Sequence, residues 1–165
     1  MRVTEVVVDA DDALWSALDK VAETPALLVA CAFDGALAPH EGDPAQARAE
    51  QQSSEALNVL VALPATTVAV VSERPTDEVA ELMFLSGAKG GGRVVTPEGV
   101  AGLRDEVGAT AAVTIGLVPD PASGDDDVVV GVSTILGTED APYQAEDVDD
   151  IAEVLEELAS LRRRV

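Results

Sequence analysis

One stretch near the start of the chain most limits what the chain can fold into. Residues 27–33 read Leu-Leu-Val-Ala-Cys-Ala-Phe, an apolar run of strand length, and Asp34 and Gly35 follow it directly. A continuous apolar run that ends at turn residues is typical of a strand buried on both faces, as in parallel sheets covered by helices. Open α/β sheets bind their ligands outside the carboxyl ends of such strands, so residues 32–36 are the first candidate site.

Further strand patterns and helix patterns alternate along the rest of the chain. Apolar, mostly β-branched runs predict strands at 66–71, 94–96, 111–115 and 128–132. Segments with apolar residues three or four positions apart predict helices at 45–63, 75–85, 97–107 and 147–161. A valine-rich run at 3–8 predicts an additional edge strand, followed by a helix that ends before Pro25. This alternation predicts an α/β fold with a mostly parallel sheet between two layers of helices.

Two short motifs carry a family resemblance. Residues 32–39, Ala-Phe-Asp-Gly-Ala-Leu-Ala-Pro, resemble the first motif of haloacid-dehalogenase (HAD) phosphatases, Asp-x-Asp-Gly-Thr-Leu. The Gly-Asp-Pro at 42–44 makes the chain most similar to trehalose-phosphate phosphatases, and Ser72-Glu73-Arg74 resembles their second motif, Ser-Gly-Arg. The resemblance covers residues 27–161 and implies a HAD-like Rossmannoid α/β/α sandwich. The segment before residue 97 is too short for the inserted cap domain of these phosphatases, so we expect a capless fold.

Several motif positions hold residues that lack the family's chemistry. The resemblance places a nucleophilic, magnesium-binding aspartate at Ala32 and a threonine hydroxyl at Ala36, but a methyl group can neither attack phosphorus nor bind a hard cation. At Glu73 a carboxylate replaces a glycine beside the expected phosphate site, and the two like charges repel. The strand at 111–115 ends in Gly-Leu-Val, without the magnesium-binding acids of the family. We therefore expect no cofactor, although the resemblance implies magnesium for the family.

These losses predict a catalytically inactive pseudoenzyme. In this hypothesis the chain is a protein-interaction, scaffolding or regulatory subunit, with a protein partner or a second copy of itself. One alternative is a small-molecule binding module that takes a sugar or a sugar phosphate in the crevice at the strand ends. Another is a minimal magnesium-dependent phosphatase in which Asp34 is the nucleophile or base and Ser72, Arg74 and the acids at 125–127 assist it. Ser72 and Glu73 also suit a purely structural role, as caps of the following helix.

Composition narrows the function further. A formal charge of −21 with only ten Lys and Arg residues argues against binding to nucleic acid, whose phosphates need cations. The acidity fits general solubility in an acidic proteome, adaptation to high salt, or an acidic face for a basic partner. We favour the first, because acidic residues occur along the whole length of the chain, although composition alone does not separate high salt from a binding face. No apolar run approaches the about 20 residues that span a bilayer, and no secretory leader is evident, which predicts a cytoplasmic protein. We expect one domain over residues 1–165, with a core at 25–165 and an extension at 1–24.

Three further groups of residues have a structural and a functional interpretation. Cys31 is the only cysteine, which excludes an internal disulfide and predicts a buried apolar residue in the central strand. The three aspartates at 125–127 follow Pro and Gly residues, so we interpret them as a solvated hairpin loop, with metal binding as the alternative. The arginines at 162–164 suit the negative end of the last helix, although they are also available to a partner.

Overall fold

The computed structural model describes residues 5–33, 36–37, 51–72, 92–96, 99–117, 127–132, 135, 137–138, 141–146 and 148–164. Within these ranges, the side chains of 5–12, 51 and 92–94 are not described. The helices are α1 (Glu5–Val21), α2 (Gln51–Val61), α4 (Gly99–Val107) and α5 (Val148–Arg163). The strands are β1 (Leu27–Ala32), β2 (Thr66–Val71), β3 (Gly92–Val95), β4 (Ala111–Ile115), β5 (Val128–Val132) and β6 (Tyr143–Ala145). No helix in this part of the chain is both long and apolar enough to cross a membrane.

The strands form one sheet with β1 near its centre. Their order is β3-β2-β1-β4-β5-β6, and every neighbouring pair is parallel. Almost all side chains of β1 and β2 are buried. This fits strands at the centre of a parallel sheet, because helices cover both faces of the sheet there. In register, Cys31 of β1 lies between Val70 of β2 and Ile115 of β4. The predicted parallel α/β sheet is confirmed.

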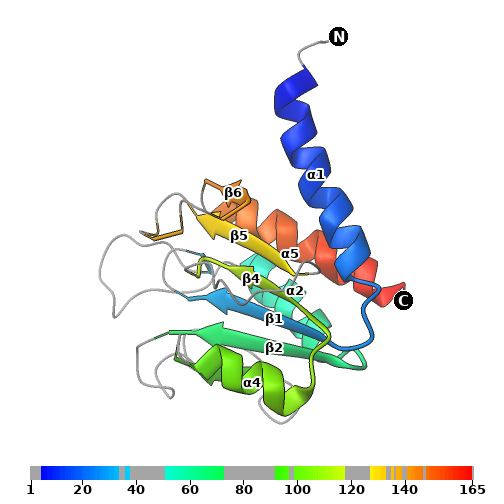
Figure 1. The fold of residues 1–165 in the computed structure, drawn as a ribbon, viewed down its shortest axis with the longest axis vertical. Coiled ribbons are helices and arrows are strands. Elements are labelled where there is room, and N and C mark those ends of the chain that lie inside the picture. Colours follow the sequence, from blue (N-terminus) through cyan, green and yellow to red (C-terminus); the bar gives the residue numbers. More distant parts are fainter. Residues whose placement is uncertain are drawn as a thin grey trace.

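Alternate residues of β1 enter two different cores. Leu27, Val29 and Cys31 join a large cluster with residues of α1, α2 and α5. Leu28 and Ala30 face the other way and pack in a smaller cluster with Leu103 of α4. Figure 1 shows α4 in front of the sheet and α2 and α5 behind it. The described elements therefore form the three-layer α/β/α sandwich that the sequence predicts.

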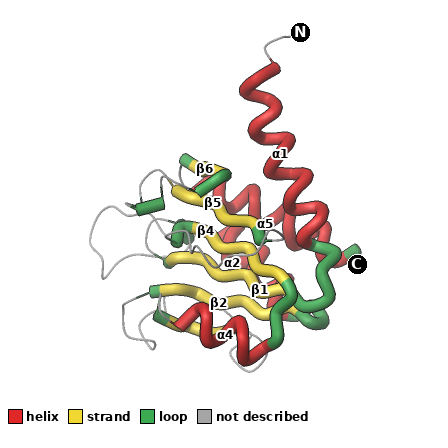
Figure 2. The backbone as a smooth tube through the Cα atoms, in the orientation of Figure 1, coloured by secondary structure: helices red, strands yellow, loops and turns green. Residues whose placement is uncertain are grey.

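The amino-terminal helix differs from the prediction. Residues 3–8 were expected to form an edge strand, but α1 already begins at Glu5. Figure 2 shows that its first half extends beyond the sheet, where no strand is available for pairing. Its second half buries Leu14, Leu18 and Val21, whose spacing places them on one face of a helix. The strand preference of the valines depends on packing against a neighbouring strand, and no described strand lies beside the first half of α1.

Two features in the carboxyl-terminal part of the chain also differ from the prediction. β6 was missed because it has only three residues and follows Pro142. The hairpin expected at 125–127 is wrong, because β5 runs parallel to β4 and so a crossover must connect them.

Arg162, near the end of α5, is buried rather than available to a partner. Only 5% of its surface is exposed. Its Nη1 donates to the carbonyl oxygens of Ala22 (2.8 Å) and Thr24, its Nη2 donates to that of Ala65 (3.0 Å), and its Nε donates to Thr66 Oγ1 (3.0 Å). Burial lowers the pKa of this guanidinium from its usual value. One side chain thus ties α5 to the segment after α1 and to the start of β2.

Candidate functional site

The sheet order places a topological switch point at the carboxyl ends of β1 and β4. From β1 the chain continues to β2 and β3 on one side, and it then returns to β4 on the other side of β1. Loops that leave two adjacent parallel strands in opposite directions separate there, and open α/β sheets bind ligands at this switch point. The predicted site residues Ala32 and Ala36 lie at this edge.

A tight turn follows β1. The amide of Phe33 donates to the carbonyl oxygen of Val71 at 3.0 Å, which extends the pairing of β1 with β2. The amide of Leu37 then donates back to Ala32 (3.3 Å) and to Phe33 (3.1 Å). Phe33, Ala36 and Leu37 are fully buried. Asp34, which belongs to this turn by sequence, lies outside the described residues, as does Gly35.

The backbone of β4 approaches this turn at Gly116. Gly116 has φ +75°, and a Cβ on it would lie 3.1 Å from Ala32 Cβ and 3.3 Å from Ala36 Cβ. Ile135, in the loop after β5, would be nearer still, with its Cδ1 at 2.9 Å. Glycine is therefore required both by the backbone conformation and by the neighbouring side chains. We call these four residues, Ala32, Ala36, Gly116 and Ile135, the apolar collar.

Ser72 brings a hydroxyl to the same edge. It follows β2 directly, is buried, and donates its amide to the carbonyl oxygen of Val95 at 3.0 Å. β2 is the neighbour of β1, so the turn after β1 and Ser72 leave the sheet from adjacent strands. Glu73 and Arg74, the other two residues of the predicted second motif, lie outside the described residues. Their roles stay predictions.

The described residues of this edge do not fit a metal ion. Within the described part of the chain, no three His, Cys, Asp or Glu side chains come together in a way that would hold a cation. The apolar collar supplies methyl groups, and Mg²⁺ requires oxygen ligands in near-octahedral geometry. Cys31 faces the core beneath this edge, and burial raises the pKa of its thiol to about 12, so it is neither nucleophile nor ligand at neutral pH.

Asp127 has a structural role at the opposite edge of the sheet. Its carboxylate forms a two-bond ion pair with the guanidinium of Arg104 and accepts the amide of Ala112 at 3.0 Å. The Asp127 side chain is 3% exposed, so it is not the solvated loop residue that the sequence suggested. The pair joins α4 to the residue directly before β5, at the end of the strands opposite to their carboxyl ends. Residues 125 and 126 lie outside the described residues.

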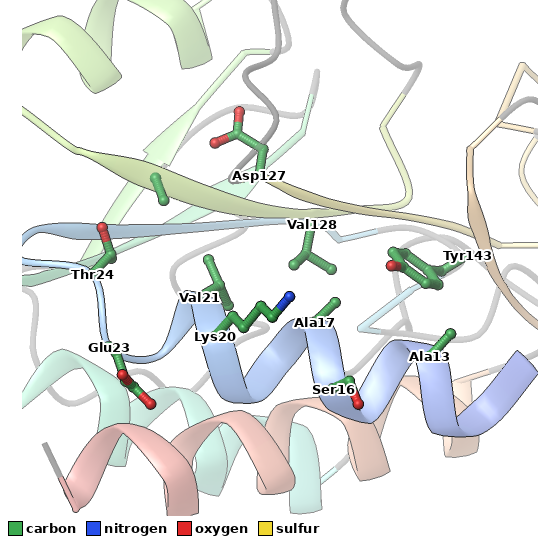
Figure 3. Close-up of a pocket in the computed structure, with 11 residues that line it drawn as sticks. Ala13, Ser16, Ala17, Lys20, Val21, Glu23, Thr24, Asp127, Val128 and Tyr143 are labelled. Atoms are coloured by element: carbon green, nitrogen blue, oxygen red, sulfur yellow. The ribbon is translucent and has the colours of Figure 1, made fainter. Parts of the chain in front are cut away.

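A cavity of about 650 Å³ also opens at this amino edge. In Figure 3, Ala13, Ala17 and Lys20 of α1 face Val128 and Tyr143, the first residues of β5 and β6. The carboxylate of Asp127, which lines this cavity, is already paired with Arg104. We place the candidate site at the carboxyl edge, because parallel α/β sheets position reactive groups there.

Comparison with known proteins supports the fold. No family model and no curated protein matches the chain. Solved structures do match. A 3-deoxy-D-manno-octulosonate 8-phosphate phosphatase from Moraxella catarrhalis, crystallised with magnesium, phosphate and KDO, has a TM-score of 0.64 and 14% identity over 93% of this chain and 94% of that one. A protein from Legionella pneumophila assigned to the HAD superfamily (subfamily III A) of hydrolases has a TM-score of 0.61 and 16% identity over 93% and 96%. A probable YrbI family phosphatase from Pseudomonas syringae pv. phaseolica 1448a has a TM-score of 0.61 and 16% identity over 89% and 92%.

These matches confirm the HAD-like α/β fold and overturn three expectations. The matched structures are phosphatases and a hydrolase. They contradict the prediction of an inactive interaction subunit or binding module, and they contradict the prediction that the chain is not an enzyme. The prediction of no cofactor is contradicted by the magnesium in the Moraxella structure. The sequence interpretation rested on changes at Ala32, Ala36 and Glu73 and on the missing acids after the strand at 111–115, and it extended them to the whole site. The sheet order still gives a switch point, and the sequence still has Asp34, Ser72 and Arg74.

Proposed function

We propose that this chain hydrolyses phosphate monoesters at the carboxyl edge of β1 and β4. The observation that carries the proposal is the sheet order, which places the turn after β1 at the switch point of a HAD-like phosphatase fold. Ser72, on the adjacent strand end, adds a buried hydroxyl within the same edge. The likeness to the Moraxella phosphatase extends over nearly the whole of both chains, which supports a catalytic function of the same class.

In this proposal Asp34 is the general base. Ala32 ends β1 with a methyl group, so attack by a side chain at that position is excluded and water is the nucleophile. The Asp34 carboxylate takes a proton from water as the water oxygen forms its bond to phosphorus. The bond from phosphorus to the ester oxygen breaks, and the protonated Asp34 returns the proton to that leaving oxygen. The products are an alcohol and inorganic phosphate, and Asp34 is regenerated.

Ser72 and Arg74 bind the phosphoryl group in the same proposal. A hydroxyl donor and a guanidinium match the oxygens of a phosphate, whose charge grows on the transferring group in the transition state. Magnesium is present in the Moraxella structure, but the described residues of this chain supply no set of ligands for it. We therefore assign no step to a metal ion. The assay described next measures whether the activity depends on magnesium.

The proposal is tested by phosphate release from p-nitrophenyl phosphate, with and without magnesium. We expect Asp34→Asn to lower kcat by about 10²- to 10⁴-fold, the contribution of a positioned acid–base group. Asp105→Asn is the matched control, because Asp105 is an exposed aspartate of α4 on the helix that covers the other face. Equal activity in the wild type and Asp34→Asn, or no phosphate release in either condition, would contradict the proposed function.

The finer expectations from the sequence remain proposals. The resemblance to trehalose-phosphate phosphatases makes trehalose 6-phosphate one substrate to test. A single domain over 1–165 is supported by the two clusters that share one sheet. A protein partner or homo-oligomer, and a cytoplasmic location, rest on the sequence alone; native mass measurement tests the first of these.

A further inference from the structure

The amino edge of the sheet holds a cavity that plays no part in the proposed reaction. Its volume is about 650 Å³, and it lies between the second half of α1 and the first residues of β5 and β6. All of its lining residues belong to the part of the chain that the structure describes. Pockets of about 300–1,000 Å³ bind small organic molecules, so this cavity is large enough for a ligand.

Small side chains on α1 leave this space between the helix and the sheet. Ala13, Ala17 and Lys20 lie four and three positions apart, which places them on one face of the helix. Figure 3 shows this face turned toward β5 and β6, while the hydroxyl of Ser16 points away from these strands. The two alanines extend only one methyl group each into the space, so α1 does not fill it.

Two polar side chains point into the cavity from opposite walls. In Figure 3 the Lys20 ammonium, from α1, and the Tyr143 hydroxyl, from β6, are directed toward one another beside Val128. Among the described residues, neither side chain has a hydrogen-bond or ion-pair partner. An ammonium and a phenol both donate hydrogen bonds, so together they suit the two oxygens of one carboxylate.

The acidic residues of the lining do not neutralise Lys20. The carboxylate of Asp127 is paired with Arg104 of α4, which packs on the opposite face of the sheet. Glu23 points away from Lys20 in Figure 3. One cation therefore faces the cavity, in a chain whose formal charge is −21. It balances the single charge of a carboxylate, whereas the second charge of a phosphate monoester would stay unpaired.

The rest of the lining favours a hydrocarbon group. Val21, Ala111 and Val128 line the cavity and belong to the buried main core. The hydroxyl of Thr24, which is also in the lining, already shares a hydrogen bond with that of Thr110 at 2.6 Å. Sugar hydroxyls would lose water there without gaining a partner, whereas a hydrocarbon chain gains free energy when it leaves water.

We infer that this cavity is a second binding site, which takes a small aliphatic molecule with one carboxylate. Lys20 and Tyr143 bind the two carboxylate oxygens, and the hydrocarbon part packs against Val21 and Val128. The site lies at the amino edge of the sheet, opposite the proposed phosphatase site, and it does not depend on that function. A bound molecule joins α1 to β5 and β6.

The test measures binding of octanoate to the whole chain by isothermal titration calorimetry. 1-Octanol has a hydrocarbon chain of nearly the same length without the charge, so it measures the apolar contribution alone. We expect saturable binding of one octanoate per chain. It should be about tenfold tighter than that of 1-octanol, because hydrogen bonds to a charged group are stronger than neutral ones.

Three variants separate the parts of the site. Lys20→Met keeps an apolar stem without the ammonium, and it should weaken octanoate binding about tenfold while 1-octanol binding is unchanged. Lys20 is exposed, so this replacement does not disturb the fold. Tyr143→Phe should weaken octanoate binding about threefold, as expected for the loss of a neutral donor. Ala17→Leu fills the cavity and should abolish the binding of both molecules.

Arg163→Met is the matched control for Lys20→Met. Arg163 is an exposed cation of α5 that does not line this cavity, so its replacement removes the same charge elsewhere on the surface. It should leave octanoate binding unchanged.

Amide hydrogen exchange gives a readout that non-specific binding would not move. Octanoate should slow exchange in the second half of α1 and in β6, because the bound molecule joins these elements. Exchange in α4, on the opposite face of the sheet, should not change.

Several outcomes would overturn the inference. One is the absence of saturable octanoate binding to the wild type, and another is 1-octanol binding as tightly as octanoate. An equal loss in Lys20→Met and Arg163→Met would indicate attraction to surface cations in general. A dimeric native mass with protected α1 amides and no octanoate binding would assign the cavity to a second copy of the chain. Phosphate release is measured separately, so failure of this site and failure of the proposed function are distinguishable.

Discussion

Replacing Arg162 with methionine is the strongest test of how the layers are joined. Arg162→Met keeps a long apolar stem and removes the guanidinium, which makes four hydrogen bonds to Ala22, Thr24, Ala65 and Thr66. The carbonyl oxygen of Ala65 also accepts the amide of Leu27, so that acceptor keeps one partner. The carbonyl oxygens of Ala22 and Thr24 lose the donor that Arg162 gives them.

The expected loss follows from these four bonds. Hydrogen bonds from a charged donor contribute about 1.5–3 kcal/mol each, which would give roughly 6–12 kcal/mol if they were additive. They share one side chain, so they are not additive, and methionine also avoids the desolvation that lowers the pKa of Arg162. We expect a net fall in the unfolding free energy of about 3 kcal/mol. For a chain of this length, that corresponds to a Tm lower by about 6–12 °C.

Urea unfolding followed by circular dichroism measures the change. If residues 1–165 form the single domain that we propose, wild type and variant unfold in one transition with the same m-value, and only the midpoint moves. Arg163→Met is the matched control, because Arg163 is exposed on the same helix, and it should change stability by less than about 0.5 kcal/mol. The reasoning is refuted if Arg162→Met stays within about 0.5 kcal/mol of wild type, or if Arg163→Met costs as much.

Two other predictions concern buried titratable groups. Burial raises the pKa of Cys31 from 9.0 to about 12, so the unfolded chain releases this proton at a lower pH than the folded one. Its contribution to stability is complete below pH 9 and is lost between pH 9 and about 12; urea curves across this range should fall more steeply for the wild type than for Cys31→Ala. Asp127→Asn should lower stability by about 1–2 kcal/mol, because the buried carboxylate pairs with a half-exposed Arg104, while Asp105→Asn should leave it unchanged. Equal midpoints for the two aspartate variants in thermal unfolding would contradict the role given to this ion pair.

Most strands could be predicted because their signal is local. Leu27–Ala32, Thr66–Val71, Ala111–Ile115 and Val128–Val132 are apolar runs between turn residues, and each forms a strand where the sequence places it. The start of α1 could not be predicted from its valines, because their conformation depends on whether a neighbouring strand is present. The sequence does not show that the first half of α1 stands beyond the sheet.

The strand that carries the candidate site was predictable, and the surroundings of its end were not. The run at 27–33 predicted β1, whereas the approach of Gly116 and Ile135 to Ala32 depends on segments that follow two other strands. The burial of Arg162 could have been predicted from its position in the helix, although its charge suggested an exposed residue. It follows Ile151, Leu155 and Leu158 at helical spacing, which places it on the buried face of α5. The ion pair of Asp127 had no such signal, because Arg104 lies on α4, 23 residues earlier in the sequence.

The packing of α2 against α5 affects how the chain folds during its synthesis. α2 covers one face of the sheet together with α5, and Arg162 of α5 bonds to Thr66, 96 residues earlier in the sequence. During synthesis, β1, β2 and α2 therefore leave the ribosome long before the helix that completes their layer. Contacts between residues so distant in sequence slow folding, because a long loop must close before the contact forms. The nascent chain keeps an uncovered apolar face until α5 is made, and it is most prone to aggregation in that interval.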